Sequence, residues 1–341
     1  MITELEEFDL KHHNTFRIPA TTDVWIEYTS AKDLPAIAAG ISGRKHLAIG
    51  SGSNMLFTGH FNGVILHSRI LDAETHMVDS NHMLLRAGSG IELDSLVEQT
   101  CRNGLWGLEN LSGIPGSVGA SAVQNVGAYG IEAKDVIHNI ECYDMLTGNF
   151  VSFIPDKCDY GYRHSIFKTP EVKGRYIVTY VTYRLSVNPV PHLDYGNLAS
   201  RAGNDPTPYG IREAVMSLRA SKLPSVDEYG SAGSFFKNPV ISPAEYSTLC
   251  ERVSQIYGEN TPIPHFTTDH GIKVPAAWLI DKCGLKGYRS GGAAVWHLQP
   301  LVIVNLTGKC TAGDVLSVEN HIVKSVREKF GIDLSPEVEH I

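Results

Sequence analysis

The feature that most constrains this chain is a segment of glycine and other small residues, 114–130, in a first half rich in predicted strands. Small residues let backbone N–H groups come close to a bulky anion and bond it. A second glycine loop, 50–54 (G-S-G-S-N), follows a predicted strand. Neither loop fits the dinucleotide-binding pattern G-x-G-x-x-G at the start of a long helix, and neither fits the P-loop pattern G-x-x-x-x-G-K-[ST]. The two loops therefore disfavour a Rossmann site and a P-loop kinase, and favour a large phosphate-bearing cofactor.

The predicted cofactor contacts come from both glycine loops, with amide side chains as additional readers of the cofactor. They are Gly50, Ser51, Gly52, Ser53, Asn54, Ile114, Pro115, Gly116, Ser117, Gly119, Ala120, Ser121, Gln124, Asn125, Gly127, Ala128, Tyr129 and Gly130.

Hydrophobic periodicity predicts helices between strands. A β-α-β start has strands at 23–28, 46–50 and 63–68, and a short helix at 30–41 that begins with a Ser30–Asp33 capping box. An apolar stripe predicts a helix from about 92 to 103, and a second stripe predicts one at 315–330. The other predicted elements are a hairpin at 139–153, strands at 176–186 and 300–305, and helices at 211–220, 243–257 and 275–283. A Pro-, Gly- and Asn-rich region, 189–210, indicates a boundary or a loop.

Composition excludes several classes of function. The net charge of −8 over 341 residues argues against a general nucleic-acid binder, which needs a basic surface. The sequence contains no apolar run of about 18 residues, the length that a membrane span needs. The acidic N-terminus lacks the basic-then-apolar order of a signal peptide. The six cysteines lack C-x-x-C spacing, so we predict no metal site and expect reduced thiols. We therefore expect a cytoplasmic protein, with a monomer as the default.

Motifs along nearly the whole chain resemble one enzyme family. They include N-T-F (14–16), G-S-G-S-N, G-L-E-N-L-S-G-I-P-G-S-V-G, Q-N-V-G-A-Y-G, Y-G-Y-R-H-S-I-F-K (160–168), S-K-L-P (221–224) and G-S-F-F-K-N-P. In this order they resemble the UDP-N-acetylenolpyruvoylglucosamine reductase family. The resemblance implies non-covalent FAD, NADPH as reductant, and conversion of UDP-N-acetylglucosamine-enolpyruvate to UDP-N-acetylmuramate for peptidoglycan synthesis.

The same resemblance implies an α+β fold of the vanillyl-alcohol-oxidase (PCMH) type, in which two α/β subdomains bind FAD, with a C-terminal α/β substrate domain. We expect FAD-binding subdomains at 1–70 and 71–218 (the PCMH-type region at about 17–187), a substrate domain at 219–330, and a tail at 331–341 that returns to the active site.

Three residues are predicted to be catalytic. Arg163 offers a forked cation for the substrate carboxylate. Glu337 is carried over from the family as a partner of the enolate, and we expect it to be partly protonated beside that carboxylate. Ser234 is the predicted proton donor, because no histidine base stands nearby in sequence and the reaction asks for a proton. We expect Gly233 to allow close approach, and Phe235 and Phe236 to exclude water from the serine.

Four residues are predicted to bind the UDP part of the substrate: Tyr195, Lys222, Asn238 and Gln299. The first lies in the proline-rich region, where the type I branch of the family has a tyrosine loop that closes over the substrate. Departures from the family pattern include Trp296, which stands before His297.

Two alternatives remain at this stage. One is an FAD-dependent oxidase of the same fold, although no His or Cys for covalent flavin attachment lies in 114–130. The other is a non-enzymatic binder of nucleotide sugars, which would not need Arg163, Ser234 and Glu337 as a set.

Overall fold

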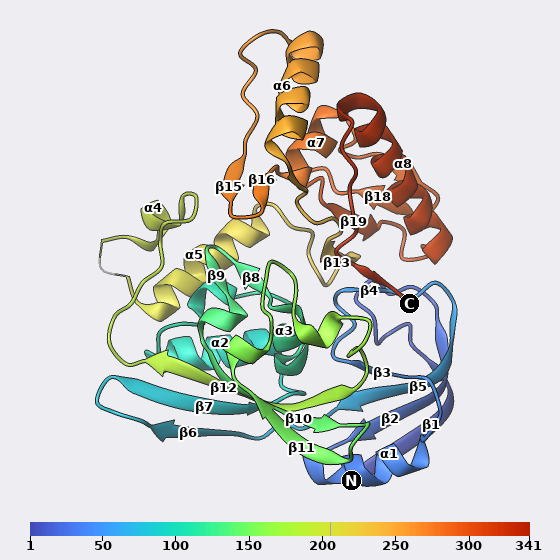
Figure 1. The fold of residues 1–341 in the computed structure, drawn as a ribbon, viewed down its shortest axis with the longest axis vertical. Helices are drawn as coiled ribbons and strands as arrows, with labels where there is room; N and C mark the ends of the chain where they lie inside the picture. The colour runs from blue at the N-terminus through green and yellow to red at the C-terminus, as the bar shows by residue number, and fades with distance from the viewer. Residues whose placement is uncertain (205) are drawn as a thin grey trace. The chain divides into compact units, whose positions relative to one another are not determined.

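The computed structural model describes residues 1–204 and 206–341, which divide into two compact units (Figure 1). Unit 1 comprises Met1–Phe8, Thr21–Ser51 and Phe61–Arg219. Unit 2 comprises Asp9–Ala20, Gly52–His60 and Ala220–Ile341. Unit 2 therefore includes two segments from the N-terminal part of the chain, and the finer division predicted above stays a proposal.

The first sheet of unit 1 has the order β1-β2-β5-β3. Its strands are β1 (Ile2–Asp9), β2 (Thr21–Tyr28), β5 (His60–Ser68) and β3 (His46–Ile49). A 3-10 turn (Ala31–Asp33) leads into α1 (Leu34–Gly40), and the predicted capping box of Ser30 and Asp33 is present. Strands β3 and β5 run parallel, as a β-α-β start requires.

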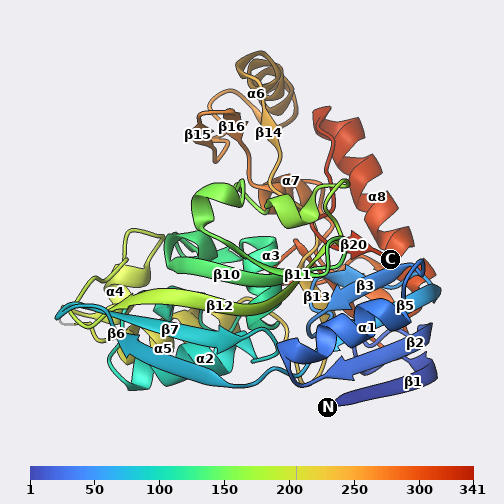
Figure 2. The same ribbon diagram turned by 60° about the horizontal axis from the view of Figure 1, so that its bottom comes forward.

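The second sheet of unit 1 is antiparallel, in the order β11-β10-β12-β7-β6 (Figure 2). Its strands are β11 (Asn149–Phe153), β10 (Ile137–Asp144), β12 (Tyr176–Ser186), β7 (His82–Gly88) and β6 (Ala73–Met77). Helices α2 (Leu93–Arg102) and α3 (Val118–Gln124) share a hydrophobic core with this sheet. The buried residues of α2 are Leu93, Leu96, Val97, Thr100 and Cys101, which confirms the predicted stripe.

The end of unit 1 forms a smaller core around Trp106. Helix α5 (Pro208–Ala220) provides Ile211, Val215 and Leu218, and α4 (Leu198–Ala202) provides Leu198. A small ribbon, β8 (Gly127–Ala128) and β9 (Ile131–Glu132), lies within the glycine-rich segment and just after it.

Unit 2 is built on a four-stranded sheet, β13-β19-β18-β17, and a three-stranded sheet, β14-β16-β15. The strands are β13 (Gly230–Ser234), β19 (Val302–Asn305), β18 (Ala293–Val295), β17 (Arg289–Ser290), β14 (Val240–Ile241), β16 (Gly271–Lys273) and β15 (Phe266–Thr268). The helices are α6 (Pro243–Tyr257), α7 (Ala276–Lys282) and α8 (Ala312–Phe330). Near the C-terminus, β20 (Glu339–His340) pairs in parallel with β4 (Met55–Leu56).

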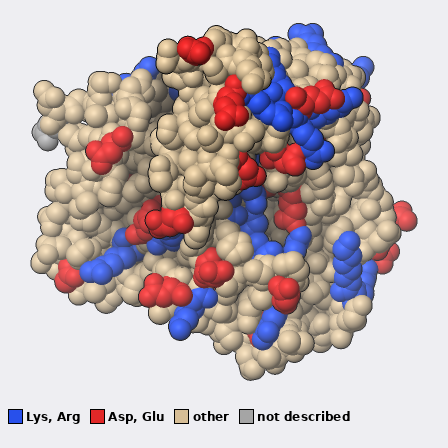
Figure 3. Space-filling view, turned by 45° about the horizontal axis from the view of Figure 1, so that its top comes forward, with Lys and Arg blue, Asp and Glu red and all other residues tan. Residues whose placement is uncertain are grey.

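The face in Figure 3 shows basic side chains beside acidic ones, as expected for a chain with 29 Lys and Arg and 37 Asp and Glu residues. Across the described residues, no helix combines the length and the hydropathy that a membrane span requires.

Candidate active site

Within unit 1, the start of the first glycine loop, Gly50, lies in contact with the glycine-rich segment 114–130. A Cβ added to Gly50 would collide with the hydroxyl of Ser117 and lie 3.4 Å from the Cβ of Ala120. A Cβ on Gly119 would lie 2.8 Å from that of Ser89. Glycine is therefore required at both positions for the backbones to pack this closely. The fold thus brings together two segments that the sequence separates by more than 60 residues.

The turn that carries Arg163 is bound to the glycine-rich segment. Gly161 and His164 exchange two backbone hydrogen bonds of 3.1 Å, and Arg163 lies between them with a φ of 54°. Its Nη2 donates to the carbonyl of Gly127 at 3.0 Å. Lys168 donates through Nζ to Gln124 and also to the carbonyl of Arg163. A predicted catalytic cation therefore lies beside the predicted cofactor segment.

Asn125 ends α3 in the left-handed region, with a φ of 47°, and is fully buried. Its Nδ2 donates to Glu132 and to the carbonyl of Gly161, both at 3.0 Å, and its Oδ1 accepts from the backbone N–H of Lys134. Both amide hydrogens are thus used inside the protein. The side chain of Asn125 holds the Arg163 turn in place.

Tyr195 lies beside Tyr129, near the C-terminal end of the glycine-rich segment 114–130. Its ring meets that of Tyr129 edge to face, with the centroids 5.9 Å apart. Tyr195 is 56% exposed, so most of its ring is accessible to a ligand.

Arg219 is a candidate that the sequence analysis missed. Its side chain lies close to Gly113, where an added Cβ would be 2.9 Å from Nε. Burial lowers the pKa of this guanidinium, while Tyr129 and Asp94 act in the opposite direction. Within the described residues the guanidinium has no carboxylate at ion-pair distance, because Asp94 pairs with Arg212 instead. A half-buried cation beside the glycine-rich segment can hold an anionic ligand. The position of Arg219 in the sequence, just before S-K-L-P, did not indicate a role in anion binding.

In unit 2, a β-bulge sets the direction of Ser234. Strand β13 pairs with β19 through Ser231 opposite Val304 and Ser234 opposite Val302, so β13 has one extra residue. Gly233 lies in that stretch with a φ of 70°. A bulge with glycine in the left-handed region bends a strand and re-aims the next side chain. Ser234 is exposed as a result of this local geometry.

The prediction that Phe235 and Phe236 dry the serine is wrong for this structure. Their exposed fractions are 0% and 1%, and both pack in the hydrophobic core of unit 2, whereas Ser234 is exposed. The rings anchor the strand beyond the bulge. No described protein atom lies within 4 Å of a Cβ added to Gly233, so the predicted close approach would involve a ligand and stays a prediction.

The backbone of Glu337 lies beside this strand. Its N–H donates to the carbonyl of Phe235 at 2.8 Å, one residue from Ser234. Asn54 donates through Nδ2 to the carbonyl of Glu337 at 3.2 Å, and the N–H of Glu339 donates to the carbonyl of Asn54 at 3.0 Å. Unit 2 thus brings Ser234, Glu337 and the end of the 50–54 loop together.

The predicted UDP-binding residues of unit 2 lie in two places. Oδ1 of Asn238 accepts from the N–H of Ala276, the first residue of α7, at 2.9 Å. Lys222 is exposed, and its carbonyl accepts from Nε1 of Trp296 at 3.0 Å. The tryptophan that departs from the family pattern therefore ties Lys222 to the strand preceding Gln299.

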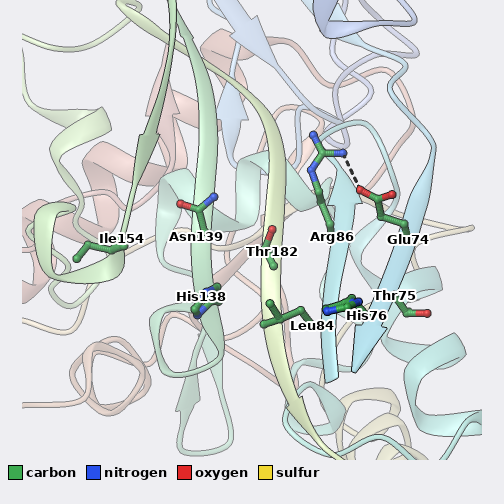
Figure 4. Close-up of a pocket in the computed structure, with 9 residues that line it drawn as sticks. All are labelled: Glu74, Thr75, His76, Leu84, Arg86, His138, Asn139, Ile154 and Thr182. Carbon is green, nitrogen blue, oxygen red and sulfur yellow. Dashed lines mark hydrogen bonds and ion pairs between the residues drawn. The ribbon is translucent and has the colours of Figure 1, made fainter. Parts of the chain in front are cut away.

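The hollows on the open face of the five-stranded sheet form a separate feature. One, of about 530 Å³, is lined by the nine residues shown in Figure 4. Arg86 and Glu74 form an ion pair there, with Nη1 and Oε1 3.3 Å apart. None of those nine residues is a predicted site residue, so this hollow has no part in the candidate site.

Comparisons with known proteins agree with the predicted fold and family. Residues 225–341 match the profile "UDP-N-acetylenolpyruvoylglucosamine reductase, C-terminal domain", and residues 23–153 match "FAD binding domain". The crystal structure of UDP-N-acetylenolpyruvylglucosamine reductase from Thermus caldophilus covers 100% of this chain and 98% of its own, with a TM-score of 0.67. At 24% identity it shows the shared fold alone. The predicted α+β fold with an FAD-binding domain is confirmed.

Closer sequence relatives carry the same name. The UDP-N-acetylenolpyruvoylglucosamine reductase of Porphyromonas gingivalis is 41% identical over 341 residues, covering 98% of each chain. That of Bacteroides fragilis is 40% identical over 339 residues, covering 98% of this chain and 99% of its own. The chain belongs to the UDP-N-acetylenolpyruvoylglucosamine reductase family.

Proposed function

We propose that this protein uses NADPH to reduce UDP-N-acetylglucosamine-enolpyruvate to UDP-N-acetylmuramate, in the cytoplasmic synthesis of peptidoglycan precursors. Membership of the family supports the choice of substrate. The structural observation that carries the proposal furthest is the binding of the Arg163 turn to the glycine-rich segment.

The residues around the glycine loops fit a non-covalently held FAD. Gly50 packs on Ser117 within unit 1, and the small residues of 50–51 and 114–130 let backbone N–H groups approach an anionic diphosphate. Arg219 adds a positive charge beside the same segment. Bound FAD, once reduced by NADPH, supplies the hydride for the vinyl CH₂ carbon. The protein itself has to bind the carboxylate and deliver a proton.

Arg163 is suited to the substrate carboxylate. A guanidinium has five N–H donors in a fork that matches a carboxylate, and Nη2 of Arg163 donates to the carbonyl of Gly127. Such a contact favours the developing negative charge as electrons move towards the carboxylate. Glu337 is the proposed partner of the resulting enolate.

Ser234 is the proposed proton donor. Its O–H bond breaks as a C–H bond forms at the vinyl carbon that did not receive the hydride, so hydride and proton together saturate the double bond. The serine oxygen then takes a proton from water, which an exposed hydroxyl can reach. Tyr195, Lys222, Asn238 and Gln299 are proposed to hold the UDP group.

Stopped-flow measurements on Ser234→Ala test this assignment. We expect flavin reduction by NADPH to keep its wild-type rate, and flavin reoxidation by the enolpyruvyl substrate to fall by at least 10²-fold, in the range that general acids contribute. Ser231→Ala, on the same strand, is the matched control and should leave both half-reactions unchanged. Normal reoxidation in Ser234→Ala would remove the serine from this role. A purified protein that binds no FAD would overturn the whole proposal.

A further inference from the structure

Asn110 makes two hydrogen bonds that no role assigned so far explains. Its Nδ2 donates to the carbonyl of Tyr129 at 2.8 Å and to the carbonyl of His192 at 2.9 Å. Tyr129 belongs to the glycine-rich segment, and His192 precedes Tyr195 in the proline-rich region. The side chain is 1% exposed. One buried amide therefore joins the predicted cofactor segment to the loop that presents Tyr195.

The orientation of this amide is fixed by its acceptors. Both neighbours are carbonyl oxygens, so only the NH₂ end of the side chain can bond them, and a flipped amide would place three oxygens together. The Oδ1 atom is buried and has no hydrogen-bond partner among the described residues. An apolar or smaller residue would suit that oxygen's surroundings equally well, so the two donated bonds are what the asparagine specifically provides.

The same turn makes a further link to the loop. Oε2 of Glu109 accepts from the N–H of Gly107 at 2.6 Å. Burial raises the pKa of Glu109, while the hydrogen bond from Gly107 and, least, the charge of His192 oppose that rise. Beyond His192, Leu193 and Leu198 pack with Trp106. The Tyr195 loop is thus attached on both sides of the tyrosine.

We propose that Asn110 is a positioning residue that couples occupation of the flavin site to the order of the Tyr195 loop. FAD contacts fix Tyr129, the Asn110 amide transmits that constraint to His192, and the loop then holds Tyr195 over Tyr129. This inference rests on the proposed function, because it takes 114–130 as the FAD-binding segment. Coupling through two buried hydrogen bonds corresponds to a factor of about ten, within the range typical of coupled sites.

The test is limited proteolysis at Arg201, which is exposed on α4 within the same loop region. The protein is compared after removal of FAD and after its restoration, and cleavage at Arg201 is followed by mass spectrometry. We expect FAD to slow this cleavage about ten-fold in the wild type. Asn110→Asp, which has the same shape but lacks the NH₂ donors, should bind FAD and show less than a two-fold effect.

Ser112→Ala is the matched control. Ser112 is also fully buried in this turn, but its Oγ donates within the turn, to the carbonyl of Glu109 at 2.6 Å. It should keep the full effect of FAD. In the FAD-loaded enzyme, Asn110→Asp should raise KM for the enolpyruvyl substrate about ten-fold, while the rate of flavin reduction by NADPH stays unchanged.

The outcomes separate the two hypotheses. If the wild type binds FAD and cleavage at Arg201 does not change, the coupling is overturned while the proposed function stands. The same holds if Asn110→Asp keeps the wild-type protection, or if it loses FAD binding itself. If the wild type binds no FAD, the proposed function fails first.

Discussion

At the residue scale, Gly233 shows how one backbone angle can set the direction of the next side chain, that of Ser234. Its φ of 70° lies in the region that residues with a Cβ rarely adopt, and nothing described crowds an added Cβ. The need for glycine here is therefore conformational and not steric. Since the extra residue of the bulge sits between Ser231 and Ser234, a relaxed φ would shift the register that exposes Ser234.

Replacing Gly233 with alanine should therefore destabilise the protein by about 1–2 kcal/mol, the cost of a left-handed conformation with a Cβ. It should also slow flavin reoxidation more than flavin reduction. Urea unfolding and the two half-reactions measure these effects. Gly40→Ala is the matched control, since Gly40 also has nothing within 4 Å but has no positive φ and lies in α1. It should be neutral or slightly stabilising. Equal effects at both positions would contradict the argument.

Glu319 is a buried acid on α8 that holds the C-terminal strand. Its side chain is 10% exposed, and its Oε2 lies 3.2 Å from Nε2 of His340 on β20. Burial raises the pKa of Glu319 from 4.5 to about 7 and lowers that of His340. Burial thus disfavours the charged form of each group. Below pH 4.5 the Glu319 carboxyl is protonated in both folded and unfolded chains and costs nothing. Above pH 7 it is ionised in both, and the folded protein bears the cost of burial.

Glu319→Gln should remove that cost. The free energy of unfolding of the variant, minus that of the wild type, should rise between pH 4.5 and 7 by about 3 kcal/mol and then level off, at 1.36 kcal/mol per pKa unit. Chemical denaturation across this pH range measures the difference. Glu328→Gln, at an exposed position of the same helix, is the control and should give a flat difference. A flat profile for Glu319→Gln as well would refute the assigned cost.

At the scale of elements, the open face of the five-stranded sheet is held by a cross-strand network. Arg86 on β7 donates to both carboxylate oxygens of Glu141 on β10, at 2.6 and 2.7 Å. Its guanidinium also lies 3.4 Å above the ring of Tyr180, on the strand between them. The planar group thus spans three strands of an otherwise solvated face, which a point charge cannot do.

Arg86→Lys should for this reason cost about 1 kcal/mol, because it keeps the charge but loses the forked bond and the stacking. Thermal and urea unfolding would report this loss. Arg184→Lys, on the same sheet but 50% exposed and 3.9 Å from Asp79, should change stability by much less. If the two lysine variants are equally stable, the network contributes nothing beyond charge.

At the scale of the whole molecule, local patterns predicted elements well and long-range pairing poorly. The stripes of α2 and α8 and the strand at 176–186 match the structure, because amphipathic spacing is written in consecutive residues. The exposed β1 and β6 and the two-residue strands went unpredicted, since a strand exposed on both faces or only two residues long shows no apolar alternation. Likewise, the motifs named Ser234 and Glu337, but only the fold shows that Glu337 lies beside Phe235. Arg219 was missed because its lack of a carboxylate partner among the described residues depends on the surrounding fold, which the local sequence does not show.

Unit 2 contains segments from both ends of the chain, and this allows a test of whether its C-terminal part can fold alone. Its core includes Phe16, Ile18 and Leu56 from the N-terminal segments, and Asn305 donates through Nδ2 to the carbonyl of Phe16 at 3.0 Å. Burial of three such side chains contributes on the order of 2 kcal/mol each, comparable to the whole stability of a small domain. A fragment that spans 220–341 contains the matched C-terminal profile but none of these side chains, and it also lacks β4, the partner of β20.

We therefore expect the 220–341 fragment alone to bind a hydrophobic dye and to melt without a cooperative transition. Co-expression with 1–219, which supplies both N-terminal segments, should restore cooperative unfolding. The two preparations are compared by calorimetry and dye fluorescence, with the intact chain as reference. If the 220–341 fragment unfolds cooperatively without the 1–219 fragment, the C-terminal part forms its core by itself. The segments Asp9–Ala20 and Gly52–His60 would then not be needed for that core. In that case the boundary near residue 220 would be an autonomous folding limit, and β13, which carries Ser234, would not depend on the N-terminal half for its shape.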